Sequence, residues 1–233
     1  MQAVILAGGL ATRLAERARS VPKALLPISG RPFLAWQLEA LHRCGFRHVL
    51  LCIGHFGEQI RDFLGDGAAF GVTVAYSHDG PQLLGTGGAL RRALEQLEPT
   101  FLVTYGDSYL PFDYAAPLRD LETHAEALGT MSVFLNEGAW DRSNTAVVGE
   151  SVVAYDKHSN HPSLRYIDYG AMALRRSLIA EHEADSVFSL EQIQSQLAST
   201  GKLRAFEAQE RFYEIGSETG IQDLEAKLAA GPF

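Results

Sequence analysis

Short apolar runs alternate with amphipathic segments along the first half of the chain. AVILAGG (3–9) and HVLLCIG (48–54) each read as a short buried strand that ends in glycine, and the segment between them, 32–44, has a helical pattern. Further apolar runs lie at 72–76, 100–106 and 130–135, separated by amphipathic segments. Because strands that alternate with helices build parallel sheets covered on both faces, this pattern predicts a mostly parallel, three-layer α/β fold.

The rhythm changes after residue 136. Strand candidates at 146–149, 151–156 and 165–174 lie close together, which predicts a smaller antiparallel subregion packed against the first sheet and hence a mixed sheet. Closing helices are expected at 188–199 and 218–229. The chain contains neither a low-complexity linker nor an internal repeat, so we read it as one domain, 1–233.

Composition narrows the class of protein. The 28 acidic and 20 basic side chains give a formal charge of -8, which disfavours a nucleic-acid binder. No apolar stretch approaches the length of a bilayer span and no basic segment precedes the run at 3–7, so we expect no membrane partner. Cys44 and Cys52 lack the spacing of a zinc site. We read them as reduced, buried thiols and expect a cytoplasmic location.

A glycine-rich loop with two cations follows the first strand. Gly8 and Gly9 leave the strand end, and Arg13 and Lys23 bracket the loop. Glycine lets backbone N–H groups approach a phosphate closely, and the carboxyl end of a strand is the usual ligand crevice of open α/β folds. The alternative is a plain tight turn with solvated cations. The spacing matches neither GxGxxG nor GxxxxGK[ST], so no dinucleotide-binding turn and no Walker A loop is indicated.

Residues 3–28 resemble the signature of the sugar-phosphate nucleotidyltransferases, in which LAGG, TRL and PK follow one another before apolar residues and a proline. The heptose 1-phosphate guanylyltransferases and their near relatives are the members most similar to this chain. The resemblance implies a Rossmann-like fold, with 1–136 as the nucleotide-binding half and 137–233 as the sugar-phosphate-binding half. Ala11 stands where most members have glycine, which narrows the loop without removing a charged group.

Two further segments extend the nucleotide side of this resemblance. GTGG (85–88) opens a helix, so its N–H groups and hydroxyl are expected to be free to face a nucleotide, although alone it reads as a helix N-cap. Gly106 and Asp107 end a buried strand, where an isolated aspartate is usually a turn former. In the family this Gly-Asp pair holds Mg²⁺ beside the α-phosphate, and Mg²⁺ prefers such hard oxygen ligands.

The acceptor side is matched by weaker motifs. Lys157 parallels a family lysine that contacts the acceptor phosphate, although Asp156 and His158 replace its usual neighbours. YIDYGAMAL (166–174) stands where relatives have an Asn-Ala-Gly or Asn-Gly-Gly run, which would place Asp168 and Gly170 near sugar hydroxyls. Glu214 replaces an aspartate that is often the second metal ligand; its longer side chain leaves direct ligation and ligation through water both open.

The resemblance therefore implies an enzyme that joins a nucleoside triphosphate to a sugar 1-phosphate, with Mg²⁺ as cofactor and with pyrophosphate as the second product. Relatives include monomers, dimers and tetramers, so a homo-oligomer is compatible with it. The expected catalytic residues are Arg13, Lys23 and Asp107; the nucleotide-binding residues are Leu6, Ala7, Gly8, Gly9, Gly85, Thr86, Gly87 and Gly106; the sugar-phosphate-binding residues are Lys157, Asp168 and Gly170; and the metal ligands are Asp107 and Glu214.

Two alternatives remain at this point. A cytidylyltransferase acting on phosphocholine or another alcohol phosphate would keep the fold and change the acceptor. A quaternary ammonium calls for an aromatic cage, and Tyr166 and Tyr169 flank Asp168. A non-catalytic nucleotide-binding homologue is the second alternative, suggested by Ala11 and Glu214; turnover with Mg²⁺ would exclude it.

Overall fold

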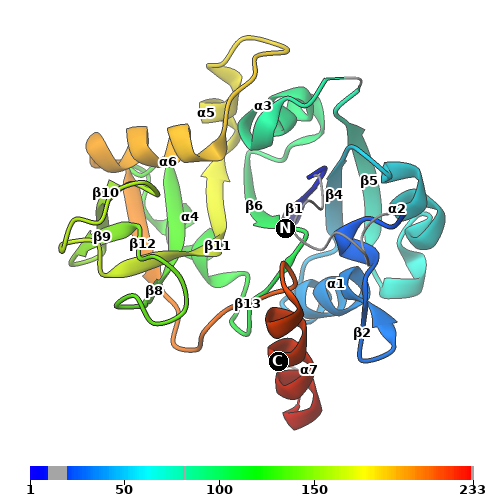
Figure 1. Cartoon of the computed structure of the whole chain (residues 1–233). Coiled ribbons are helices and arrows are strands. Elements are labelled where there is room, and N and C mark those ends of the chain that lie inside the picture. The colour runs from blue at the N-terminus through cyan, green and yellow to red at the C-terminus, as the bar shows by residue number, and fades with distance from the viewer. Residues whose placement is uncertain (10–19, 81, 232–233) are drawn as a thin grey trace. The chain divides into compact units, whose positions relative to one another are not determined.

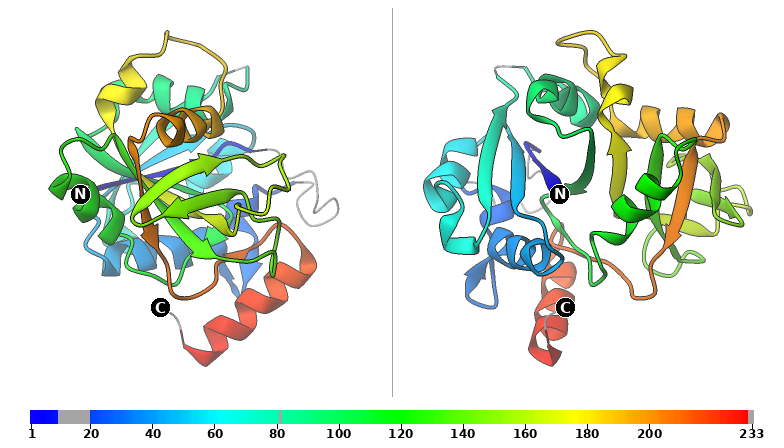
Figure 2. Two further views of the ribbon diagram at one scale, coloured as in Figure 1. Left: turned by 90° about the vertical axis from the view of Figure 1, so that its left-hand side faces the viewer. Right: turned by 180° about the vertical axis from the view of Figure 1, so that it is seen from behind.

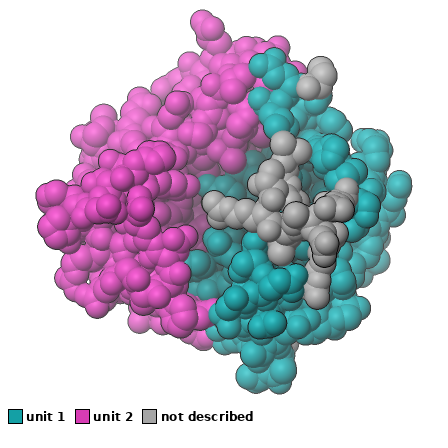
Figure 3. All heavy atoms as spheres, viewed as in Figure 1, with its two compact units in different colours: residues 1–83, 104–111, 212–233 teal, residues 84–103, 112–211 magenta. Residues whose placement is uncertain are grey.

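The computed structural model describes residues 1–9, 20–80 and 82–231. Contacts along the chain gather into two compact units, coloured separately in Figure 3. Unit 1 takes its residues from 1–83, 104–111 and 212–233, and unit 2 from 84–103 and 112–211. No described helix is both long enough and apolar enough to span a membrane. The predicted division of binding roles between 1–136 and 137–233 stays a prediction.

The sheet of unit 1 is parallel. Strands β1 (Gln2–Ala7), β4 (His48–Ile53) and β5 (Thr73–His78) lie side by side in the order β5-β4-β1 (Figure 1). The last residues of the three strands are aligned: Ala7 of β1 lies opposite Ile53 of β4, which lies opposite His78 of β5. The residues that follow the three strands therefore share one edge, where open α/β sheets bind ligands.

The remaining elements of unit 1 surround that sheet. Helix α1 (Phe33–Arg43) presents Phe33, Leu34, Leu38 and Leu41 to the interior with no exposed surface, the spacing of a buried helical face. The other elements are η1 (Lys23–Leu25), β2 (Pro27–Ile28), β3 (Arg31–Pro32), α2 (Gly57–Leu64), η2 (Ala68–Phe70), β7 (Ser108–Tyr109), β13 (Tyr213–Glu214) and α7 (Glu218–Ala230).

Unit 2 contains a mixed sheet. Strand β8 (Gly129–Leu135) pairs antiparallel with β11 (Tyr166–Arg175) and parallel with β12 (Leu203–Glu207). β10 (Ser151–Tyr155) and β9 (Thr145–Val148) continue it as an antiparallel hairpin, lime in the left view of Figure 2. Strand β6 (Thr100–Tyr105) gives its first four residues to unit 2 and its last two to unit 1. The helices are α3 (Gly85–Arg92), η3 (Leu94–Gln96), α4 (Ala116–Thr123), α5 (Arg176–Ala180) and α6 (Leu190–Ser199).

Helices cover both faces of the unit 2 sheet. Successive side chains of a strand point to opposite faces. On β8, Thr130 donates to Asp120 of α4 at 2.8 Å, whereas the sulfur of the next residue, Met131, lies 3.7 Å from Gln194 Nε2 of α6. α4 and α6 therefore lie on opposite faces. The predicted layered α/β fold, with a parallel sheet and antiparallel additions, is confirmed.

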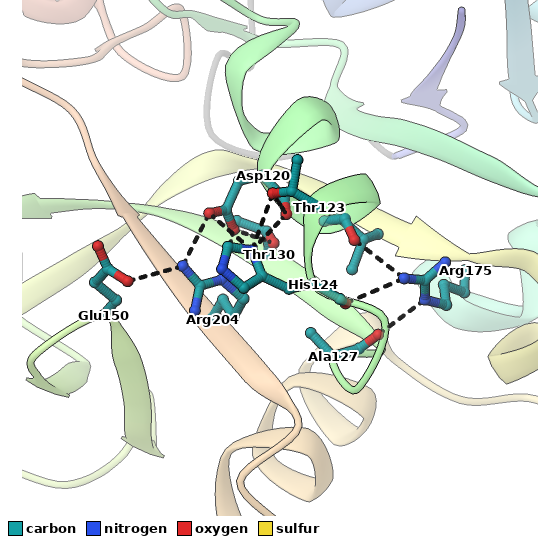
Figure 4. A network of polar contacts seen from close by, with 9 residues as sticks. Asp120, Thr123, His124, Ala127, Thr130, Glu150, Arg175 and Arg204 are labelled. Carbon is teal, nitrogen blue, oxygen red and sulfur yellow. Dashed lines mark hydrogen bonds and ion pairs between the residues drawn. The ribbon is translucent and has the colours of Figure 1, made fainter.

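A polar network fastens α4 to this sheet (Figure 4). Arg204 of β12 forms a bidentate ion pair with Asp120, with Nε–Oδ2 at 2.8 Å and Nη2–Oδ1 at 2.9 Å. It also donates a hydrogen bond to Glu150. Burial raises the pKa of Asp120, but hydrogen bonds from Arg204 and Thr130 outweigh burial and hold the pKa below its usual value. Nearby, Arg175 donates to the carbonyl oxygens of Leu121, His124 and Ala127 at the end of α4.

Replacing Asp120 with asparagine should lower the free energy of unfolding at pH 7 by about 2 kcal/mol, because Arg204 loses the more buried of its two charged partners and keeps only the exposed Glu150. Since the folded-state pKa is lowered, this stabilisation is present above the unfolded-state pKa of about 4 and is lost as the pH falls through the folded-state value. Urea unfolding of both proteins from pH 7 downward measures the difference.

The matched control is Asp185→Asn, because the Asp185 side chain is 72% exposed in its pair with Arg92. The Asp185→Asn substitution should lower the free energy of unfolding by less than about 1 kcal/mol at pH 7. If the difference in free energy of unfolding between wild type and Asp120→Asn stayed constant down to about pH 3, that result would contradict the role of the ion pair.

Candidate active site

The loop after β1 packs tightly against its neighbours at the carboxyl edge of the unit 1 sheet. A Cβ atom on Gly8 would lie 2.9 Å from Asp79 Oδ2, so that this side chain would have to move, and 3.3 Å from the Gly54 nitrogen, a tight contact with the backbone. A Cβ on Gly9 would meet nothing within 4 Å among the described residues. Gly8 therefore permits the close approach of three strand ends, whereas Gly9 is not crowded by any of the described residues.

A short turn at the same edge carries Asp107. The Gly106 N–H donates to Leu6 O and the Ile215 N–H donates to Asp107 O, each at 3.0 Å. Strands β7 and β13 pair antiparallel, with Glu214 opposite Ser108. The backbone of this turn is thus fastened to β1 on one side and to β13 on the other, and Glu214 is brought to the strand beside Asp107.

Lys23 and Asp107, 84 positions apart, form an ion pair. Lys23 Nζ lies 3.1 Å from Asp107 Oδ2, and the two side chains are 22% and 37% exposed. Lys23 begins η1 directly after Pro22, whose fixed φ of -65° sets the direction of the chain there. Both charged groups reach solvent, so a bound anion or cation can exchange for either partner.

The carboxylates at this edge of the sheet decide whether it can bind a metal ion. Among the described residues, no group of three or more His, Cys, Asp or Glu side chains is arranged to hold a metal. Asp107 nevertheless offers a partly exposed carboxylate at a strand end, with Glu214 on the neighbouring strand. Mg²⁺ is commonly held by one or two carboxylates, with substrate phosphates and waters completing the shell. The residues therefore fit Mg²⁺ bound together with a nucleotide.

A hollow of about 520 Å³ lies within unit 1 at the ends of β4 and β5. Its wall includes residues 54–59, His78, Gly80 and Leu83. Two sequence-predicted features cannot be placed beside it, because Arg13 and Ala11 lie outside the described residues.

In unit 2, the GTGG segment packs against residues 186–190. The N–H groups of Gly87 and Gly88 donate to Phe188 O at 3.0 and 3.2 Å, and Thr86 Oγ1 accepts from Leu190 N at 2.7 Å. A Cβ on Gly87 would lie 2.3 Å from the Phe188 ring, and Gly85 has a φ of +73°. These two amides are thus engaged, contrary to the expectation that they are free. Nucleotide contact by Gly85, Thr86 and Gly87 stays a prediction, and it would use other atoms.

The predicted acceptor residues gather around Tyr155 in unit 2. Asp168 Oδ2 accepts from Tyr155 Oη at 3.2 Å and from Gln194 Nε2 at 2.8 Å, and Asp168 Oδ1 accepts from Gly170 N at 3.0 Å. Lys157 Nζ lies 5.8 Å from the centre of the Tyr155 ring. Asp168 also opens a β-bulge in β11, where Gly170 has a φ of +93°.

Several residues that build these clusters have no motif to reveal them. Tyr155, Gln194 and Asp79 were not singled out from the sequence. The one available signal was a glutamine at an apolar position of a predicted helix, since Gln194 follows the buried Ile193 and is itself 1% exposed. Its partner, Asp168, lies 26 positions away.

Comparison with known proteins identifies the family. The model of the MobA-like NTP transferase domain matches residues 3–191. D-glycero-alpha-D-manno-heptose 1-phosphate guanylyltransferase of Campylobacter jejuni is 28% identical over 218 residues, which cover 93% of this chain and 95% of that protein. The crystal structure of HddC from Yersinia pseudotuberculosis superposes with a TM-score of 0.80 at 27% identity, covering 97% of this chain and 99% of the other.

A third relative matches more strongly over a shorter stretch. N-acetylmuramate alpha-1-phosphate uridylyltransferase of Neisseria meningitidis serogroup B is 39% identical over 121 residues, so that the alignment spans 51% of this chain and about half, 52%, of that protein. These findings confirm the family predicted from LAGG, TRL and PK. The chain belongs to the MobA-like NTP transferase family.

Proposed function

We propose that the protein transfers a nucleotidyl group from a nucleoside triphosphate to a sugar 1-phosphate and releases pyrophosphate. The observation that carries this proposal is the Lys23–Asp107 pair, 3.1 Å apart beside the turn that Gly106 fastens to β1. It combines a cation for phosphate oxygens with a carboxylate for a metal ion at the ligand-binding edge of a parallel sheet.

Each group on the nucleotide side has a proposed role. Lys23 stabilises charge on the reacting phosphoryl group, and the backbone of Leu6, Ala7, Gly8, Gly9 and Gly106 lines the phosphates. Arg13 lies outside the described residues; from its place in the motif, we propose that it neutralises the outer phosphates. Asp107 and Glu214 would hold Mg²⁺, which neutralises developing charge on phosphate oxygens when bound.

On the acceptor side, we propose that Lys157 contacts the phosphate and that Asp168 and Gly170 border the sugar. Asp168 accepts three hydrogen bonds from Tyr155, Gln194 and Gly170. A carboxylate has about four acceptor positions, so one remains for a sugar hydroxyl. The surrounding donors hold the carboxylate in one orientation, which favours a defined hydroxyl position.

The aromatic cage needed for phosphocholine is not supported. Tyr169 is 1% exposed, and its ring lies 5.1 Å from Phe112 in an edge-to-face contact of the core. Tyr166 donates from its hydroxyl to Glu207. The two tyrosines therefore do not present a pair of open ring faces to a quaternary ammonium.

We infer GTP and a manno-type or heptose 1-phosphate as the substrates, because the heptose guanylyltransferase aligns over 93% of this chain whereas the uridylyltransferase aligns over 51%. Initial rates of pyrophosphate release from five nucleoside triphosphates, each with a panel of sugar 1-phosphates and phosphocholine, test this inference. Release that requires GTP and either a manno-type or a heptose 1-phosphate is expected. Release with phosphocholine as the only active acceptor would show that the acceptor is phosphocholine and not a sugar 1-phosphate. No release with any pair, from folded protein, would favour the non-catalytic homologue.

We also propose a cytoplasmic location, which rests on the composition of the chain.

A further inference from the structure

A buried glutamine of α1 contacts the turn that carries Asp107. Gln37 has no exposed surface and lies on the apolar face of α1 with Leu34, Leu38 and Leu41. Its Nε2 donates to Tyr105 O at 2.7 Å and to Ser108 O at 3.2 Å. Its Oε1 is buried and accepts no hydrogen bond from any residue that the structure describes.

This arrangement is costly for a helix that only needs to pack. A buried amide oxygen without a donor is destabilising relative to an apolar side chain of the same shape. Leucine or methionine would fill the same space without that penalty. The amide therefore has a use that packing does not supply, and the two carbonyls that it contacts indicate the use.

The two acceptor carbonyls stand on either side of Gly106 and Asp107. One nitrogen thus holds both ends of the four-residue segment 105–108. The Gly106 and Asp107 backbones are fixed from outside by β1 and β13, through Leu6 and Ile215. Gln37 supplies the third attachment, from helix α1, so the backbone of the turn that carries the Asp107 carboxylate is held at three places.

We propose that Gln37 is a positioning residue that holds the segment 105–108 so that Asp107 presents its carboxylate to the metal ion. This inference rests on the proposed function, in which Asp107 is a metal ligand. Residues that orient a ligand typically change metal affinity by tenfold or more when they are replaced.

The test uses Gln37→Met, which keeps the volume and removes the donor. Mn²⁺ binding is measured by calorimetry in the presence of a non-hydrolysable nucleoside triphosphate, with wild type and Asp107→Ala as references. About tenfold weaker Mn²⁺ binding is expected, together with a raised Mg²⁺ concentration for half-maximal rate and a kcat close to wild type at saturating Mg²⁺. The control Leu41→Met changes a residue of the same buried face whose aliphatic side chain cannot donate a hydrogen bond to the turn, and it should bind Mn²⁺ as wild type does.

A second readout does not depend on the metal. Hydrogen exchange of the peptide that contains residues 104–110 should be faster in Gln37→Met than in Leu41→Met. Wild-type Mn²⁺ affinity in Gln37→Met, or unchanged exchange of this peptide, would overturn the proposal. If wild type itself bound no Mn²⁺, the metal role of Asp107 would fail, whereas the exchange rates would still decide whether Gln37 holds the turn.

Gln37→Asn provides an independent variant in case the methionine protein does not fold. It retains the amide but shortens the side chain by one methylene, which withdraws the nitrogen from Tyr105 O. The same loss of Mn²⁺ affinity and the same faster exchange are expected, and wild-type values in a folded Gln37→Asn protein would contradict the inference.

Discussion

Replacing Asp107 with alanine should lower kcat about a thousandfold and leave the protein folded. We propose that this carboxylate binds the metal ion beside the reacting phosphates, so its loss removes charge neutralisation at the step of transfer. The fold should persist because the Asp107 side chain is 37% exposed and the turn is held through its backbone. Initial rates of pyrophosphate release and thermal unfolding measure the two effects.

The matched control is Glu39→Ala. Glu39 is also a carboxylate of unit 1 in an exposed pair, with Arg31 at 3.1 Å and 40% of the Glu39 side chain exposed. It should retain wild-type turnover. An Asp107→Ala protein that turns over within tenfold of wild type would remove Asp107 from the catalytic machinery.

Replacing Lys23 with alanine should lower kcat by about 100- to 1000-fold, because a preorganised cation is lost where negative charge develops. Lys23→Arg should restore little of this rate, since a guanidinium is larger and differently shaped than an ammonium. Metal affinity should not fall, because the Lys23–Asp107 pair competes with the metal for Asp107 Oδ2. Single-turnover rates and Mn²⁺ titration of the same samples separate the two quantities.

The exposed Lys202 offers a control, and Lys202→Ala should behave as wild type. Because Lys23 and Asp107 act on one reacting group, the double variant should be little slower than the slower single variant. Multiplied losses in the double variant would show that the two residues act independently, against the arrangement proposed here.

The periodic parts of the fold could be predicted from sequence. Helices expected at 32–44, 188–199 and 218–229 correspond to Phe33–Arg43, Leu190–Ser199 and Glu218–Ala230. These segments have long apolar faces, and strands β1 and β4 are nearly continuous buried runs, whereas β5 alternates between buried and exposed residues. Both signals come from burial, which the local sequence records directly.

Single polar residues could not be predicted in the same way. Gln37 and Gln194 each interrupt an apolar face, but their partners lie 68 and 26 positions away, at Tyr105 and Asp168. The apolar face marks such a residue as buried, but a local pattern does not reveal which distant group it bonds. The close approach of Gly8 to Asp79 also depends on the strand register, which aligns the ends of β1, β4 and β5.

The glycine cluster at 85–88 illustrates the opposite case, a motif with more than one physical explanation. A nucleotide contact and a packing requirement both call for residues without side chains. The structure supplies the second explanation through Phe188, whose carbonyl receives two amides of the cluster and whose ring excludes a Cβ on Gly87. Sequence alone could not separate the two.

Nucleotidyl transfer can be distinguished from other reactions by following the phosphorus atoms of the triphosphate. GTP labelled at the α-phosphorus is incubated with Mg²⁺ and a heptose 1-phosphate, and the products are separated. We expect the α label to appear in a nucleotide sugar and a γ label to appear in pyrophosphate. Transfer of the γ label to the acceptor, or an α label that remains in GTP under conditions where the folded protein binds the nucleotide, would contradict it.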